Sequence, residues 1–186
     1  MVKKLTFTES KEDAKLLRLD LGAGKGGKTP EGFLAVDLVP WKGIKVHDLR
    51  QRWPWKANSV DEVNADYLVH YLTARERVHF ANELHRVLKP GATAVIKAPH
   101  WASAKAYLDL QVQWPPVSEG WFWTLNKAWR EAQNCADTSG YHCDFEHTLG
   151  YGLHPAILSR NQEYQQHAVS FFKEAAQDIF ATLIKR

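Results

Sequence analysis

The chain has 186 residues, of which 45% are hydrophobic and 24% are charged, so its composition is that of a globular protein and excludes a disordered or collagen-like chain. No apolar run is long enough to span a membrane, and the first ten residues lack the apolar core of a signal peptide. We therefore expect a cytoplasmic protein without membrane contacts. The formal net charge of +3 does not indicate a nucleic-acid partner, although it does not exclude one.

Four short apolar runs in the first half of the chain are bounded by Gly, Pro or Asp and predict buried strands at residues 16–21, 33–39, 60–65 and 92–98. A helix is predicted before the last of them. Thr73 and Glu76 have the spacing of a capping box, and an apolar stripe at Val78, Ala81, Leu84 and Leu88 follows. The sequence Lys89-Pro90-Gly91 should stop this helix. Strands alternating with a helix favour an α/β fold with a parallel sheet.

The second half of the chain predicts helices at residues 126–133 and 160–176 and strands at residues 144–153 and 179–185. We expect residues 1–186 to form a single domain, in which residues 101–186 add an aromatic-rich cap and complete the sheet. Cys135, Cys143 and the nearby histidines lack the closely paired spacing of structural zinc sites, so no metal site is predicted.

A glycine-rich segment after the first predicted strand matches three motifs. Residues 22–29 spell the P-loop pattern G-x-x-x-x-G-K-T, ending in Lys28 and Thr29. A P-loop requires a helix beginning at its Lys-Thr, whereas Pro30, Glu31 and Gly32 follow here and the next strand is predicted from Phe33. The dinucleotide pattern G-x-G-x-x-G also requires a following helix, so it is a minor alternative. In the third pattern, Asp20, Gly22, Gly24 and Gly26 form acid-x-G-x-G-x-G on a strand-to-loop turn.

Further along the chain, Val36-Asp37, His47-Asp48-Leu49, Asp61-Glu62-Val63 and Leu88-Lys89-Pro90-Gly91 follow this turn in order. With the glycine segment, they make residues 15–100 resemble the class I S-adenosylmethionine-dependent methyltransferases. The resemblance implies a Rossmann-like methyltransferase fold with a mostly parallel sheet of seven, or possibly six, strands. It also implies S-adenosyl-L-methionine as the cofactor and a small-molecule or nucleobase acceptor. Each motif alone is weak, and the order of all of them carries the resemblance.

The resemblance also implies which residues bind the cofactor. The glycines would lie under the methionine part, Asp37 would accept hydrogen bonds from the ribose, Asp48 and Leu49 would contact the adenine, and Asp66 would lie near the methionine end. The full predicted set is Asp20, Gly22, Ala23, Gly24, Gly26, Asp37, Leu38, Asp48, Leu49, Asp66 and Tyr67.

This chain departs from the family pattern in its connections. Family members carry a full helix between the glycine segment and the second strand, whereas only Gly27 to Gly32 are available here. The connection from Asp37 to Val46 is also short for a crossover between parallel strands, which puts the third strand in doubt. The cofactor's methionine end should then be covered by residues further along the chain.

His100 follows the strand predicted at residues 92–98 and is the candidate general base, should the acceptor need to lose a proton. Five tryptophans lie between residues 101 and 129, and Trp101 and Trp114 are candidates for an acceptor pocket with flat, apolar walls. Two other functions stay open. One is a P-loop nucleotide-binding enzyme, and the other is a protein that binds S-adenosylmethionine without turnover.

Overall fold

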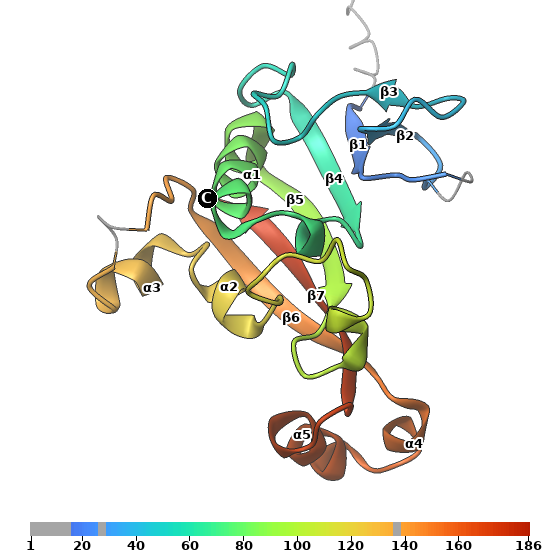
Figure 1. The fold of residues 1–186 in the computed structure, drawn as a ribbon. Helices are drawn as coiled ribbons and strands as arrows, with labels where there is room; N and C mark the ends of the chain where they lie inside the picture. Colours follow the sequence, from blue (N-terminus) through green and yellow to red (C-terminus); the bar gives the residue numbers. More distant parts are fainter. Residues whose placement is uncertain (1–15, 26–28, 136–138) are drawn as a thin grey trace, which may run out of the picture.

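The computed structural model describes residues 16–25, 29–135 and 139–186, which form one twisted sheet with helices packed against it (Figure 1). The strands are β1 (Arg18–Leu21), β2 (Phe33–Asp37), β3 (Lys45–Val46), β4 (Val60–Asp66), β5 (Leu88–Pro99), β6 (Phe145–Leu153) and β7 (Ala176–Lys185). The helices are α1 (Ala74–Val87), α2 (Glu119–Trp123), α3 (Lys127–Ala132), α4 (Pro155–Leu158) and α5 (Gln162–Phe171), with 3₁₀ turns η1 (Val69–Tyr71) and η2 (Ala104–Tyr107).

The sheet has seven strands in the order β3-β2-β1-β4-β5-β7-β6. The strands from β3 to β5 pair in parallel, and β7 is antiparallel to both of its neighbours, β5 and β6. The predicted Rossmann-like methyltransferase fold with seven strands is therefore confirmed. The third strand exists, although it is only two residues long.

The best-defined sequence prediction, the helix after Thr73, is confirmed in detail. The Thr73 hydroxyl accepts a hydrogen bond from the Glu76 amide, and the Glu76 carboxylate accepts one from the Thr73 amide, which is the reciprocal geometry of a capping box. The helix ends at Val87, and Leu88 is already extended and pairs with Val60 of β4.

The helix predicted at residues 160–176 is wrong in extent. The Asn161 side chain accepts a hydrogen bond from the Tyr164 amide and so caps a helix that starts only at Gln162, while a separate turn, α4, starts at Pro155. At the other end the backbone becomes extended at Phe172, and β7 begins at Ala176. The predicted range 160–176 therefore included loop residues on both sides of α5 and the first residue of β7.

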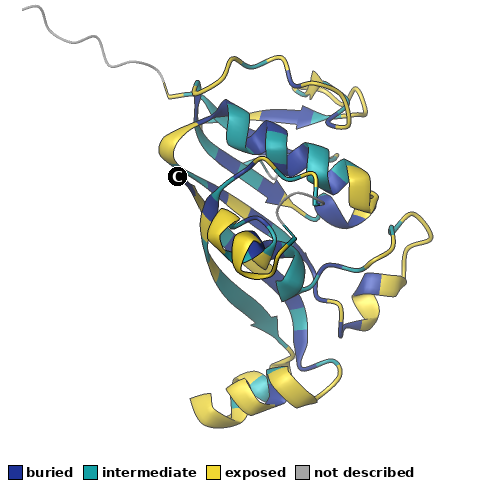
Figure 2. Cartoon of the chain, turned by 90° about the vertical axis from the view of Figure 1, so that its left-hand side faces the viewer, coloured by how far each residue is buried: buried dark blue, intermediate teal, exposed yellow. Residues whose placement is uncertain are grey.

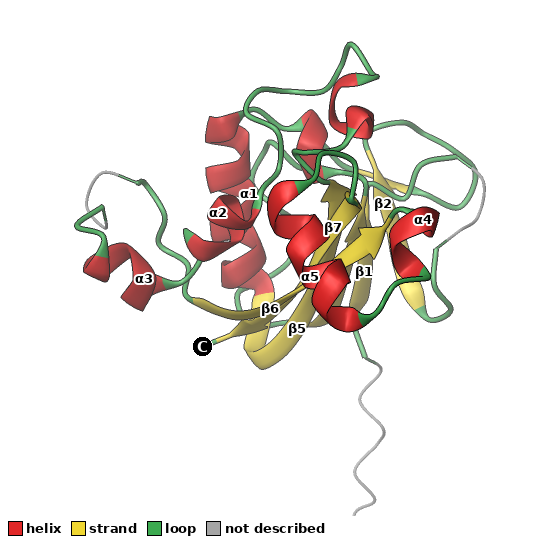
Figure 3. Ribbon diagram, turned by 90° about the horizontal axis from the view of Figure 1, so that it is seen from below, coloured by secondary structure: helices red, strands yellow, loops and turns green. Residues whose placement is uncertain are grey.

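The hydrophobic core lies between the sheet and α1, with α2 beside it on the same side of the strands (Figures 2 and 3). Alternate residues of the central strands point into it and are fully buried: Leu19, Leu21, Val63, Ala65, Ala94, Ile96, Ala98, Ile179, Ala181 and Leu183. Phe80, Leu84 and Val87 of α1 pack against them. Within the described residues no helix is both long and apolar enough to cross a bilayer.

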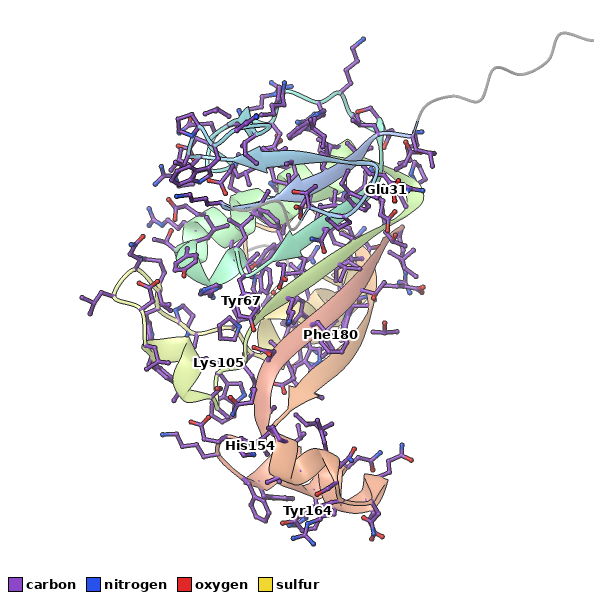
Figure 4. All side chains as sticks on the ribbon, turned by 90° about the vertical axis from the view of Figure 1, so that its right-hand side faces the viewer. Glu31, Tyr67, Lys105, His154, Tyr164 and Phe180 are labelled. Atoms are coloured by element: carbon purple, nitrogen blue, oxygen red, sulfur yellow. The ribbon has the colours of Figure 1, made fainter. Side chains whose placement is uncertain are left out.

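The opposite face of the sheet carries no helix over its central strands within the described residues, and Figure 4 looks onto it. We call this the open face. Val95, Phe180 and Ile184 on it are 36 to 38% exposed, and the Arg18–Glu62 ion pair bridges β1 and β4 there. Phe180 lies across Gly150 of β6, where a Cβ atom would stand 2.2 Å from the phenyl ring. Because Gly150 has no side chain, the Phe180 ring can lie against the backbone of β6.

A buried arginine ties α1 to the loop that follows η2. Arg77 is 2% exposed, and its guanidinium donates to the carbonyl oxygens of Val69 at 2.9 Å, Pro115 at 2.7 Å and Gln113 at 3.3 Å. Burial lowers the pKa of Arg77 to about 10. Because its hydrogen bonds go to carbonyls and none to a carboxylate, the guanidinium acts here as a multidentate clamp on the backbone.

Replacing Arg77 with leucine should lower the free energy of unfolding by about 2 to 4 kcal/mol, since buried carbonyls of two segments lose their donor. Arg75 lies on the same helix and is exposed, so Arg75→Leu serves as the matched control and should change stability by less than about 0.5 kcal/mol. Urea denaturation of the three proteins measures both values. Equal stabilities of the two variants would contradict the clamp.

Candidate functional site

The chain turns sharply at the carboxyl end of β1. Gly22 and Gly24 have φ angles of 71° and 63°, which favour glycine, and the amides of Gly22 and Ala23 both donate to the carbonyl of Val36 in β2. A Cβ at Gly22 would lie 2.9 Å from Leu68 Cδ1, whereas no atom of the described residues lies within 4 Å of a Cβ built at Gly24. The turn is therefore packed at Gly22 and open at Gly24.

Asp37 is joined to this turn. One oxygen of its carboxylate accepts the Gly24 amide and the other accepts the Val39 amide, each at 2.9 Å. Each oxygen keeps a further lone pair, so the carboxylate is held in place by backbone and can still accept hydrogen bonds from a ligand. Leu38, the next residue, is 54% exposed and presents an apolar side chain at the same edge. The structure thus brings Gly22, Gly24, Asp37 and Leu38 together, as the sequence predicted.

Other predicted residues lie near this turn in different settings. Asp20 is 5% exposed and accepts a hydrogen bond of 2.7 Å from the Asn64 amide group of β4. Asp66, at the carboxyl end of β4, is exposed. Gly26 and Lys28 lie outside the described residues. Thr29 and Pro30 are not helical, and the chain reaches β2 at Phe33 after a turn, so the described residues after Lys28 lack the helix of a P-loop.

The residues predicted at the adenine are engaged with protein groups. The Asp48 carboxylate accepts hydrogen bonds from the Arg50 guanidinium at 2.8 and 3.0 Å, and these bonds lower its pKa. The side chain of Leu49 is 6% exposed and belongs to the core, where its carbonyl accepts the Trp53 indole N–H. Leu49 therefore does not present an open apolar surface, and Leu38 is the exposed apolar side chain next to Asp37.

A polar cluster joins the carboxyl ends of β4 and β5 to the start of β7. The Tyr67 hydroxyl donates to Asp178 Oδ1 at 2.5 Å, and Lys105 Nζ lies 3.3 Å from both oxygens of the same carboxylate. Burial, and then the hydrogen bond to Asp178, raise the pKa of Tyr67. Tyr67 itself has a φ of 52°, an uncommon conformation for a residue with a side chain. Figure 4 shows Tyr67 and Lys105 at the same end of the sheet.

His100 belongs to a second, buried network. It is 1% exposed, its Nε2 lies 3.0 Å from Glu119 Oε1, and its Nδ1 accepts the Ala102 amide at 3.3 Å. The Tyr151 hydroxyl donates to the same Glu119 oxygen. Burial alone would raise the pKa of Glu119, but hydrogen bonds from His100, the backbone and Tyr151 outweigh it and lower the pKa to about 2. In these contacts Nδ1 is the acceptor from the backbone, and Nε2 is the ring nitrogen that donates to Glu119.

That arrangement argues against the predicted role of His100 as general base. A base needs a free lone pair within reach of the acceptor, and the lone pair on Nδ1 is already used by the backbone of the adjoining turn. The ring is also enclosed by protein. The prediction rested on the position of His100 just past β5, which does not reveal the direction of the side chain.

Trp101 and Trp114 are both exposed, at 48% and 78%, but they line different hollows. Trp101 lines a hollow of about 390 Å³ with Tyr107 and residues of α5, and Trp114 lines one of about 250 Å³ with Tyr107 and Leu110. Tyr107 is common to both. The two tryptophans predicted for a single acceptor pocket therefore lie on either side of η2.

Sequence reasoning missed four residues that organise these strand ends: Asn64, Lys105, Glu119 and Asp178. Asn64 could have been found, because it alternates with Glu62 and Asp66 on the face that also carries Asp20. Asp178 was the polar residue just before a predicted apolar strand. Lys105 and Glu119 gave no comparable signal, because their partners lie far away in the chain.

Comparisons with known proteins agree with this geometry. A family model described as a methyltransferase domain matches residues 33–96. The structure is similar to a SAM-dependent methyltransferase from Archaeoglobus fulgidus, with a TM-score of 0.63 and 13% sequence identity over 92% of this chain and 87% of that one. It is also similar to an S-adenosylmethionine-dependent methyltransferase from Mesorhizobium loti, with a TM-score of 0.52 and 16% identity over 92% and 91% of the chains. No curated protein matches the sequence.

Two observations of independent origin now coincide. The structure is similar in fold to solved methyltransferase structures, and the matched domain model spans Asp37 at the end of β2, Asp48 after β3 and Asp66 at the end of β4. Residues 33–96 therefore match a methyltransferase domain, and the chain has the fold of solved S-adenosylmethionine-dependent methyltransferases.

Proposed function

We propose that this protein transfers the methyl group of S-adenosyl-L-methionine to a small-molecule or nucleobase acceptor. The observation that carries the proposal is the bond between the Gly24 amide and the Asp37 carboxylate. It fixes an acceptor of hydrogen bonds beside an open glycine turn at the carboxyl ends of adjacent parallel strands, which is where open α/β sheets bind nucleotides.

The residues present fit the cofactor. The space left open at Gly24 accommodates a ligand close to the backbone, and the remaining lone pairs of Asp37 suit the two hydroxyls of a ribose. Leu38 offers an exposed apolar side chain to the adenine ring, in the part that the sequence alone assigned to Leu49. Asp48 can still accept the adenine amino group beside Arg50, because each carboxylate oxygen has a second lone pair. Asp66 and Tyr67 would flank the methionine end.

S-adenosylmethionine supplies an activated methyl group when it is bound. The protein must then hold the acceptor in line with this methyl group and keep water away from it. Residues beyond β5 are available for both tasks, because Asp178 of β7 contacts both Lys105 of η2 and Tyr67 at the strand ends. An acceptor with a free lone pair would need no proton transfer before the reaction.

We assign His100 a positioning role. Its Nε2–H donates a hydrogen bond to Glu119, the first residue of α2. Glu119 also accepts a hydrogen bond from Tyr151 of β6, so the network fixes α2 and the turn after β5 to the end of the sheet. The adjoining Trp101 thereby obtains a defined position, because its amide donates to the Val117 carbonyl just before α2. The imidazole acts through these neighbours and does not take part in the transfer.

Replacing Asp37 with alanine should weaken binding of S-adenosylhomocysteine by roughly ten- to a hundredfold, because hydrogen bonds to a charged acceptor are lost and their partners remain unpaired. Titration calorimetry measures the affinity. Asp144→Ala is the matched control, since Asp144 also accepts a backbone amide, from Lys127 at 2.9 Å, but lies next to β6. Unchanged affinity in Asp37→Ala would refute the assignment of the ribose anchor.

Turnover is tested separately with radiolabelled S-adenosylmethionine and mixed metabolites and nucleic acids. Label in an acceptor supports the enzyme. Binding of S-adenosylhomocysteine without any transfer would instead support the alternative of a binding protein without turnover.

The His100–Glu119 network should make stability depend on pH. Because the pKa of Glu119 in the folded protein is about 2, below its ordinary 4.5, its ionised form stabilises the fold above about pH 4.5, and this stabilisation is lost as the pH falls toward 2. Urea unfolding at pH 7, 5 and 3 should therefore show a smaller loss between pH 5 and pH 3 in Glu119→Gln than in the wild type. The exposed Glu163 provides the control Glu163→Gln, which should behave as the wild type. Identical profiles for all three proteins would rule out the network as a source of stability.

A further inference from the structure

The hollow that contains Trp101 lies directly beyond the ends of β5 and β7. We call it the aromatic hollow; it measures about 390 Å³ and is lined by Trp101, Ala102, Tyr107 and residues 169–173. Backbone hydrogen bonds from His100 to Gln177 and from Glu174 to Ala102 hold its two walls side by side. One wall is the turn after β5 with η2, and the other is the end of α5 and the residues that follow it.

The walls of the aromatic hollow combine aromatic rings with two hydroxyl groups that are already engaged in hydrogen bonds. The Tyr107 hydroxyl donates to the Trp101 carbonyl at 2.9 Å, and the Ser170 hydroxyl donates to the Gln166 carbonyl at 3.1 Å. Phe171 and Phe172 are 73% and 42% exposed, and both rings contact His167. A ligand here meets aromatic rings on two sides and finds the hydroxyls already engaged, which favours a flat or branched apolar molecule.

The charge at this hollow has one sign. Among the described residues that line the hollow, Lys173 alone is charged, and it is exposed. The neighbouring Glu174 points its carboxylate into the turn after β5, where it binds the Ala104 amide, the Ser103 hydroxyl and the Gln177 amide group. A ligand therefore meets the ammonium group without a competing free carboxylate, and an acidic group on the ligand is favoured over a basic one.

A continuous path of contacts links the aromatic hollow to the predicted methyl-transfer position. Tyr107 and Lys105 belong to the same short turn, η2. Lys105 contacts Asp178, which accepts a hydrogen bond from the Tyr67 hydroxyl. Tyr67 lies at the end of β4, next to Asp66. An apolar molecule in the hollow can thus direct one end along this polar cluster toward the cofactor side of the sheet.

We infer that the aromatic hollow is the acceptor subsite and that the acceptor is an apolar molecule bearing an acidic group. This inference rests on the proposed methyltransferase function, and it goes further by giving the chemical class of the acceptor. Apolar contacts at Trp101, Tyr107 and Phe171 supply affinity, and Lys173 selects for negative charge.

The test compares two fluorescent probes of the same shape, anilinonaphthalene sulfonate and the uncharged N-phenylnaphthylamine. Both should bind the wild-type protein, and Phe171→Ser should weaken both by about fivefold or more, because part of the apolar contact area is lost. Lys173→Gln should weaken the sulfonate by about two- to fivefold and leave the uncharged probe unchanged. Phe171 and Lys173 are exposed, so both variants should keep their fold.

Two control variants separate the aromatic hollow from other apolar surfaces. Phe180→Ser alters the open face, and Trp114→Ala alters the smaller hollow on the other side of η2. Neither should change the affinity of either probe. If Phe171→Ser and Lys173→Gln have no effect, or if only the controls have one, the subsite is wrong.

A transfer assay tests the acceptor class. Small molecules from a cell extract are separated into acidic, neutral and basic organic-soluble fractions and incubated with radiolabelled S-adenosylmethionine. Label should appear in the acidic fraction and fall in Phe171→Ser, and label confined to the basic fraction would overturn the inference. Calorimetry with S-adenosylhomocysteine distinguishes failure of the proposed subsite from failure of the proposed methyltransferase function. Loss of the probe pattern with intact cofactor binding refutes only the subsite, whereas absent cofactor binding refutes the proposed function.

Discussion

The short connections on one side of the sheet are the constraint on which the rest of this structure depends. Parallel neighbours are normally joined by crossovers long enough to hold a helix, and those helices cover the sheet. Here the described residues between β1 and β2 (22–25 and 29–32) and between β2 and β3 (38–44) contain none. The core is consequently one-sided, built from α1 and alternate strand residues, and parallel strands that are usually apolar throughout carry Arg18, Glu62 and Asn64 on their other face.

The same constraint shapes the site. With so little chain between β1 and β2, the glycine turn folds straight back onto its neighbour, and Gly24 comes within hydrogen-bond distance of Asp37. Among the described residues, none has an atom within 4 Å of a Cβ built at Gly24 of this turn. Later parts of the chain, namely the turn after β5 and the α4–α5 hairpin, lie beyond the ends of β5 and β7 (Figure 1).

The features that the sequence predicts correctly are local ones. The Thr73–Glu76 capping box, the apolar strand runs and the Gly22–Gly24 turn depend on residues close together in the chain, and their physical requirements can be read from a few letters. Asp37 could be placed because it ends a strand whose direction is fixed by parallel pairing. These elements were sufficient to identify the fold.

The features that could not be predicted from the sequence depend on the direction of side chains and on partners that are distant in the chain. His100 stands where a base would stand, yet its ring turns inward to Glu119, nineteen residues further along the chain. Leu49 follows Asp48 at the expected place but is drawn into the core by Trp53. Asp178 accepts a hydrogen bond from Tyr67, which lies 111 residues earlier in the chain. No pattern within a strand or turn encodes such pairings, because they arise only once the sheet order has been set.

The position of β7 has a consequence for the order in which the protein can be assembled. β7 lies between β5 and β6, yet it follows both in the chain, so during synthesis each of them presents a bare edge until residues 176–185 have left the ribosome. The first five strands can pair as they emerge, whereas the final two edges must be joined by insertion. Lys185, whose ammonium group donates to the Leu88 carbonyl and to the Asn58 side chain, reaches back to the start of β5 and closes this seam. Within the described sheet β6 pairs with β7 alone, so β6 can join the sheet only after β7 has formed.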